Sequence, residues 1–192
     1  RRDFTINTLA MPVWGDDKGT RLDKLGAIKD IDKKIIRTPL EPLKTFDDDP
    51  LRILRAIRFA SQFHFTIEKE TFEAIKARSE RLKIVSRERI TGEFLKILGS
   101  QKPSIGFSLL KKSGVLEIIF PEIDALSGVD IRENFQHKDV FLHTLKVLDN
   151  VAHKSSKLLL RFAALVHDIA KPATKQFVPG TGWTFHGHEE LG

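Results

Sequence analysis

Hydrophobic positions recur at helical spacing along most of the chain. From residue 51 onward, apolar residues return every three or four positions, which is the pattern of amphipathic helices that bury one face. This spacing predicts helices over residues 51–62, 68–81, 87–98, 105–113, 116–120, 139–153 and 157–170. Asp49 and Pro50 suit the N-cap and the first position of the first helix. Most of the chain is therefore predicted to be a series of packed helices.

The first 45 residues show a different pattern. Residues 4–13 mix β-branched and apolar side chains and precede a turn-forming cluster at 15–19, which predicts a strand followed by a loop. A polar stretch over 124–138 predicts a connector between the later helices. The predicted fold class is mainly α, divided into residues 1–45, 46–125 and 126–192, with strand structure in the first part.

Composition narrows the classes of protein to consider. Hydrophobic residues make up 41% of the 192 residues and charged residues 30%, which is ordinary for a globular protein, and no apolar run is long enough to span a bilayer. Cysteine is absent, which excludes disulfide scaffolds and thiolate chemistry and favours a cytoplasmic location. The net charge of +6 suits a polyanionic partner such as RNA, although glutamates interleave with the basic residues of the helical middle and also fit a solvated face.

An acidic residue and three arginines recur every third position on the first predicted helix: Asp49, Arg52, Arg55 and Arg58. At about 100° per residue they form one slowly turning face, so we expect the guanidinium groups to point into a common cleft. Guanidinium groups suit phosphate oxygens and nucleobase edges, and a carboxylate can accept from the exocyclic amine that cytosine and adenine share. The alternative is a helix cap with surface ion pairs, each worth about 0–1 kcal/mol.

A second pattern combines histidines with an aspartate. His143 and the adjacent His167 and Asp168 fall on two successive predicted helices, and His186 and His188 follow after a turn. Imidazole and carboxylate groups suit a divalent metal that would polarise a phosphate and activate water. The alternative is that the histidines are hydrogen-bonded core residues and that Asp168 pairs with a neighbouring lysine.

Three separated blocks of the sequence resemble one family. RRDFTINTLA (1–10), LDKLGAIKDI (22–31) and DDPLRILRAIRFA (48–60) are similar to successive motifs of the bacterial class II tRNA nucleotidyltransferases and poly(A) polymerases. RITGE (89–93) is similar to the arginine and glutamate that brace the neck of that family, and residues 167–168 resemble the HD domain often appended to it. The resemblance covers essentially the whole chain.

The resemblance implies roles for six nucleotide-binding residues: Arg2, Asp3, Asp49, Arg52, Arg55 and Arg58. Arg2 and Asp3 match residues that hold the sugar and triphosphate of the incoming nucleotide. Asp49 and Arg52 match the protein template for CTP and ATP, and the remaining arginines match further nucleotide contacts.

The resemblance also implies the identity of the three predicted parts. They correspond to the end of an α/β nucleotidyltransferase head, a helical neck and body that receive RNA, and a partial HD domain with His143, His167 and Asp168 as metal ligands. Because the chain begins at Arg1 and its only methionine is Met11, we expect a fragment truncated at both ends.

The family holds its catalytic Mg²⁺ through carboxylates that precede the RRDFT motif. We therefore expect no catalytic residue in this chain and no activity from it alone. The parent protein is expected to add CMP and AMP to the 3′ end of tRNA. Poly(A) polymerase, an HD-type phosphohydrolase acting on nucleotides or RNA ends, and a non-catalytic RNA-binding module stay open as alternatives, as does the oligomeric state.

Overall fold

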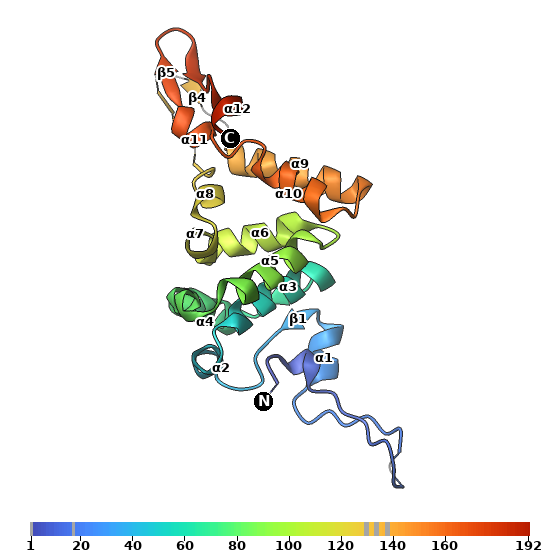
Figure 1. Ribbon diagram of the computed structural model, residues 1–192. Coiled ribbons are helices and arrows are strands. Elements are labelled where there is room, and N and C mark those ends of the chain that lie inside the picture. The colour runs from blue at the N-terminus through green and yellow to red at the C-terminus, as the bar shows by residue number, and fades with distance from the viewer. Residues whose placement is uncertain (1, 17, 129–130, 133–134, 137–138) are drawn as a thin grey trace. The chain divides into compact units, whose positions relative to one another are not determined.

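Helices dominate the computed structural model, as the sequence pattern predicts (Figure 1). The structure describes residues 2–16, 18–128, 131–132, 135–136 and 139–192. Contacts divide the chain into two compact units, Arg1–Phe94 and Leu95–Gly192. Within the described residues no helix has both the length and the apolar character needed to cross a membrane. The predicted mainly α fold class is confirmed, whereas the division into three domains stays a prediction.

The first unit is built around one long helix, α3 (Leu51–Phe63). Its other elements are a 3₁₀ helix (Thr5–Asn7), α1 (Ala27–Asp32), β1 (Ile35–Ile36), α2 (Pro42–Asp48), β2 (Thr66–Ile67), α4 (Lys69–Arg78), a second 3₁₀ helix (Ser79–Ile84) and most of α5 (Arg87–Leu98). The short strands β1 and β2 pair in parallel. Ile53, Leu54 and Ile57 of α3 are fully buried, together with Phe4 and Phe46. The apolar face of α3 is thus the core of this unit.

The strand predicted over residues 4–13 is wrong. The chain there forms the 3₁₀ helix Thr5–Asn7, and its extended pairing is limited to a bridge between Ala10 and Leu22. The Asp3 carboxylate accepts hydrogen bonds from the backbone N–H of Phe4 and the side chain of Asn7. Such local bonds offer the backbone an alternative to a strand ladder, so they outweigh the β-branched composition of the segment.

The second unit is a set of packed helices with two short hairpins. Its elements are the end of α5, α6 (Pro103–Lys112), α7 (Val115–Ile119), α8 (Pro121–Asp124), β3 (Ile131–Arg132), β4 (Phe135–Gln136), α9 (Val140–Lys154), α10 (Leu158–Val166), α11 (Lys171–Thr174), β5 (Gln176–Val178), β6 (Gly182–Thr184) and α12 (His188–Leu191). Helix α9 packs against α6 and α10. Phe107, Leu110, Leu148 and Leu165 are fully buried in this unit. Part of the predicted connector over 124–138 lies outside the described residues.

A buried arginine joins the ends of several helices in the second unit. Arg161 of α10 is only 5% exposed, and its guanidinium donates hydrogen bonds to four backbone carbonyls. These carbonyls belong to Leu98, Ser100, Ala152 and Ser155. Because the last carbonyls of a helix lack intrahelical partners, the guanidinium satisfies groups that would otherwise be buried without hydrogen bonds.

Candidate functional site

Asp49 and Arg52 lie together at the start of α3. Helix α3 begins at Leu51, as the spacing predicted, but its N-cap is Pro50 and not Asp49. The Asp49 carboxylate accepts from the Leu51 N–H at 3.2 Å. Both oxygens of Asp49 are also 3.3 Å from a guanidinium nitrogen of Arg89 on α5. The partly exposed Asp49 carboxylate therefore accepts from the first residue of the helix and from Arg89.

We call Asp49, Arg52, Arg55 and Arg58 the arginine stripe, and Arg52 is the arginine of this stripe whose charge is least compensated. Its guanidinium donates to the Thr45 carbonyl of α2 at 3.1 Å. Within the part of the chain that the structure describes, no carboxylate pairs with it. A half-buried guanidinium that is held by a neutral carbonyl keeps donors for a phosphate or a base edge.

Arg55 and Arg58 are held by acidic residues instead. Arg55 Nε and NH2 lie 2.7 and 2.5 Å from Asp3 Oδ2. Arg58 Nε lies 3.0 Å from Glu93 Oε2 of α5, and both side chains are largely buried. Burial lowers the pKa of Arg58, as does the charge of Arg55, while the charges of Glu93 and Asp3 raise it. The three guanidinium groups thus have three different partners, and the expected convergence on one cleft is not observed.

Asp3 is fully engaged as an acceptor. One carboxylate oxygen accepts from Phe4 N–H at 3.0 Å and from Asn7 at 2.8 Å, and the other accepts from Arg55. Burial raises the pKa of Asp3, but the hydrogen bonds from Asn7 and Arg55 and the charge of Arg55 together lower it by more. The pKa of Asp3 therefore lies below its usual value. Arg2 is exposed, and Arg1 lies outside the described residues.

The RITGE segment contacts the arginine stripe at two points. Glu93 pairs with Arg58 and Arg89 pairs with Asp49, so helix α5 contacts both the last and the first residue of the series 49, 52, 55 and 58. The stripe spacing alone does not reveal these partners, because they lie about 35 to 40 residues away in sequence. Asn7 was likewise missed, although its position four residues after Asp3 is a local signal.

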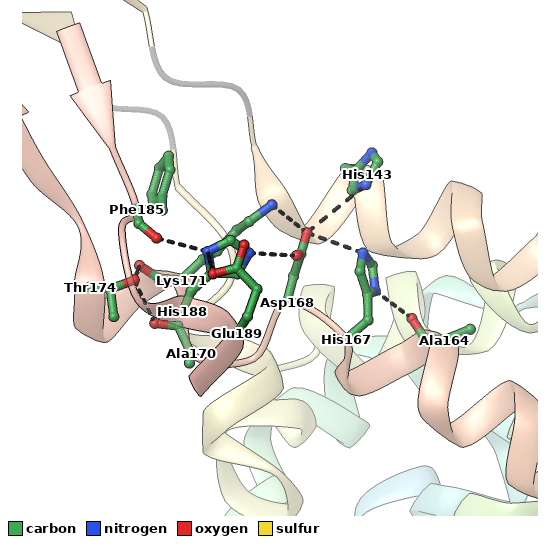
Figure 2. A network of polar contacts seen from close by, with 10 residues as sticks. All are labelled: His143, Ala164, His167, Asp168, Ala170, Lys171, Thr174, Phe185, His188 and Glu189. Carbon is green, nitrogen blue, oxygen red and sulfur yellow. Dashed lines mark hydrogen bonds and ion pairs between the residues drawn. The ribbon is translucent and has the colours of Figure 1, made fainter. Parts of the chain in front are cut away.

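The histidine and aspartate cluster forms in the second unit, as Figure 2 shows. His143 comes from α9, and His167 and Asp168 lie in the turn directly after α10. The nearest ligand atoms of the three residues all lie within 4.8 Å of one another. Both imidazoles face the same oxygen of Asp168, since His167 Nε2 is 3.2 Å and His143 Nε2 is 4.0 Å from Oδ2.

Neighbouring carbonyls orient the imidazoles of His167 and His188. His167 Nδ1 lies 2.9 Å from the Ala164 carbonyl, which can only accept, so Nδ1 donates to it and Nε2 is the ring nitrogen that faces Asp168. His188 is oriented in the same way by the Phe185 carbonyl, and its Nε2 is 3.9 Å from Asp168 Oδ1. No contact joins His186 to this cluster within the described ranges.

The donor set fits a divalent cation. Metal bonds of about 2.1 Å place neighbouring ligand atoms roughly 3 to 4 Å apart, which matches the distances from Oδ2 to the two imidazoles. Asp168 is only 4% exposed, and a buried carboxylate needs a compensating positive charge. Lys171 Nζ supplies one at 2.7 Å, so the lysine pairing expected under the alternative is present beside the histidines. His143 is more than half exposed and is not a core residue.

Comparisons with known proteins show which proteins this chain is similar to. Residues 64–126 match a family model described as "Probable RNA and SrmB- binding site of polymerase A". The chain is 41% identical over its full length to a protein of Shewanella frigidimarina named multifunctional CCA protein, and 38% identical over 97% of its length to one from Vibrio campbellii. It covers 45% of each of these relatives, so it spans a little under half of their length.

Solved structures agree with the sequence matches. A tRNA nucleotidyltransferase complexed with a primer tRNA and an incoming ATP analogue is 32% identical, with a TM-score of 0.68 over 86% of this chain and 48% of that one. The Bacillus stearothermophilus CCA-adding enzyme in complex with CTP is 38% identical, with a TM-score of 0.56 over 59% of this chain and 28% of that one. These matches confirm the resemblance to the bacterial tRNA nucleotidyltransferase family. The chain is similar to part of proteins named as CCA-adding enzymes.

Proposed function

We propose that the chain is the nucleotide-selecting and RNA-binding part of an enzyme that adds C and A residues to the 3′ end of tRNA. The full-length sequence match to multifunctional CCA proteins supports this reading, as do the similar structures titled as complexes with CTP and with primer tRNA. Poly(A) synthesis uses the same template chemistry for adenine, so it stays the nearest alternative. A cytoplasmic location follows from this function and agrees with the absence of cysteine.

The placement of a carboxylate and an uncompensated guanidinium three residues apart at the start of α3 carries this proposal. Cytosine and adenine both present an exocyclic amine next to a ring nitrogen that accepts, whereas guanine and uracil present a carbonyl and an N–H there. Asp49 would accept from the amine and Arg52 would donate to the ring nitrogen. Arg89 would hold the carboxylate in place through its contact with both oxygens.

The other predicted nucleotide-binding residues divide into two groups. Arg2 is exposed, and Arg55 is about one-third exposed, so both can offer donors to a triphosphate. Asp3 and Arg58 are bound to Arg55 and Glu93, and we assign them to holding the stripe rather than to touching the nucleotide. Lys69, Lys102 and Lys112 are exposed, and we propose that such basic side chains contact RNA phosphates.

We propose Mg²⁺ for the transfer step and a divalent metal at His143, His167 and Asp168. A cation there would polarise a phosphate and activate a water molecule, which makes hydrolysis of phosphate esters on nucleotides or RNA ends the second candidate activity. The convergence of both imidazoles on the buried Asp168 carboxylate favours this second function.

Nucleotide titrations followed by NMR test the selection step on the chain itself. CTP and ATP are expected to shift the amide signals of residues around Asp49 and Arg52, and GTP and UTP to leave them nearly unchanged. In the Asp49→Asn variant the preference should be lost, because an amide both donates and accepts. Asp32→Asn, which changes an exposed carboxylate on α1, is the matched control and should keep it. Equal shifts with all four nucleotides would refute selection by this pair.

A further inference from the structure

The ammonium group of Lys171 is bound to the carboxylate oxygen that the proposed cation site needs. Its Nζ lies 2.7 Å from Asp168 Oδ2, which is the same oxygen that His167 and His143 face at 3.2 and 4.0 Å (Figure 2). A cation bound by both imidazoles would need this oxygen as its third ligand. The lysine and the cation therefore compete for one carboxylate oxygen.

The local structure makes this competition direct. Lys171 is the first residue of α11, three positions after Asp168, and its side chain is about one-quarter exposed. The other Asp168 oxygen, Oδ1, faces His188 Nε2 at 3.9 Å. Among the described residues, no lysine ammonium group is bound to Oδ1. Because Asp168 is buried, its negative charge must be balanced at all times, either by Lys171 or by another cation.

We propose that Lys171 is an exchangeable counterion that sets the affinity and charge selectivity of the cation site. This inference rests on the proposed metal site at His143, His167 and Asp168. A monovalent ion gains little by replacing an ammonium group that is already in hydrogen-bond contact. A divalent ion gains the two imidazole ligands and a stronger attraction to the carboxylate, so it displaces Lys171. Lys171 thus lowers the affinity for every cation and excludes the monovalent ones.

Two measurements on the whole chain test this exchange with Mn²⁺ as the probe. After treatment with a chelator, the Lys171→Met variant should unfold at a lower temperature than the wild type, because Asp168 has lost its counterion. Calorimetric titration should then show that the same variant binds Mn²⁺ at least tenfold more tightly. A lysine that merely supports the fold would lower both the melting temperature and the Mn²⁺ affinity.

Further variants keep the outcome decisive. Lys171→Gln keeps a donor for Asp168 without the charge and serves if the methionine variant does not fold, with the same tighter binding expected. Lys146→Met changes an exposed lysine on α9 and should alter neither quantity. Unchanged or weaker Mn²⁺ binding in both Lys171 variants would overturn the exchange, provided that His167→Ala abolishes binding in the wild-type background. If His167→Ala leaves Mn²⁺ binding intact, or the wild type and the Lys171 variants bind none, the proposed metal site itself is wrong and the inference fails with it.

Discussion

At the scale of single residues, acidic partners hold Arg55 and Arg58 of the arginine stripe in place, whereas Arg52 has no such partner among the described residues. Asp3 is the clearest case, since its two oxygens accept from three donors, including Arg55. Arg58 and Glu93 form a second, more buried pair. The exposed chemistry is therefore concentrated on Asp49, Arg52 and the outer side of Arg55.

The depressed pKa of Asp3 leads to a prediction about stability and pH. A carboxyl group whose folded-state pKa is lowered contributes stability above its unfolded pKa of about 3.9, and this contribution disappears as the pH falls through the folded value. Asp3→Asn should therefore cost about 1–3 kcal/mol of unfolding free energy at pH 7, and the difference from the wild type should shrink below pH 4. Urea unfolding at pH 7, 5 and 3 measures this. A cost that is the same at all three pH values would show that packing, and not charge, explains it.

At the scale of elements, hydrophobic periodicity predicted the long helices well. Helix α5 has the bounds that the spacing indicated, α3 ends one residue later than predicted, and α9 is shifted by one residue at both ends. Helix α10 ends at Val166, four residues earlier than predicted. Pro172 lacks the N–H that would bond to the Asp168 carbonyl, and its ring would crowd that group, so the helix cannot run through this position. The early end places His167 and Asp168 in a turn.

The residues of the candidate sites were predictable from the sequence only where they lie close together along one helix or turn. Residues of one helix face, such as Asp49 and Arg52, follow from spacing, and Lys171 follows from its position three residues after Asp168. Partners such as Arg89 for Asp49 come from another helix, and their choice depends on tertiary packing that no local pattern encodes.

Arg161 gives a prediction at this scale, because one side chain satisfies carbonyls at the ends of several elements. Arg161→Met should lower the free energy of unfolding by about 3–5 kcal/mol, since it leaves buried carbonyls without donors. Arg161→Lys keeps the charge but has fewer donors and lacks the planar fork, so it should recover only part of the loss. Arg87→Met, at an exposed position of α5, should change stability by less than about 0.5 kcal/mol. Urea unfolding of the three variants measures these changes in free energy. If Arg161→Met were as stable as the wild type, Arg161 would not stabilise the fold through these carbonyls.

At the scale of the whole molecule, the chain combines a candidate base-reading pair in one compact unit with a candidate cation site in the other. Both sites are suited to ligands that carry phosphate, and the net charge of +6 has the sign that RNA requires. The two functions are independent in their residues. Variants of Asp49 should therefore leave Mn²⁺ binding unchanged, and variants of Lys171 should leave nucleotide selection unchanged.

Nucleotide incorporation by a nucleotidyltransferase that carries this sequence is the most direct test of the proposal that Asp49 and Arg52 read the base. The substrate is a tRNA that lacks its 3′-terminal residues, supplied with one labelled nucleoside triphosphate at a time. The wild-type protein should incorporate C and A but neither G nor U, and Asp49→Ala should lose this preference together with most of its rate. An Asp49→Ala protein that still distinguishes C and A from G and U as sharply as the wild type would contradict the account.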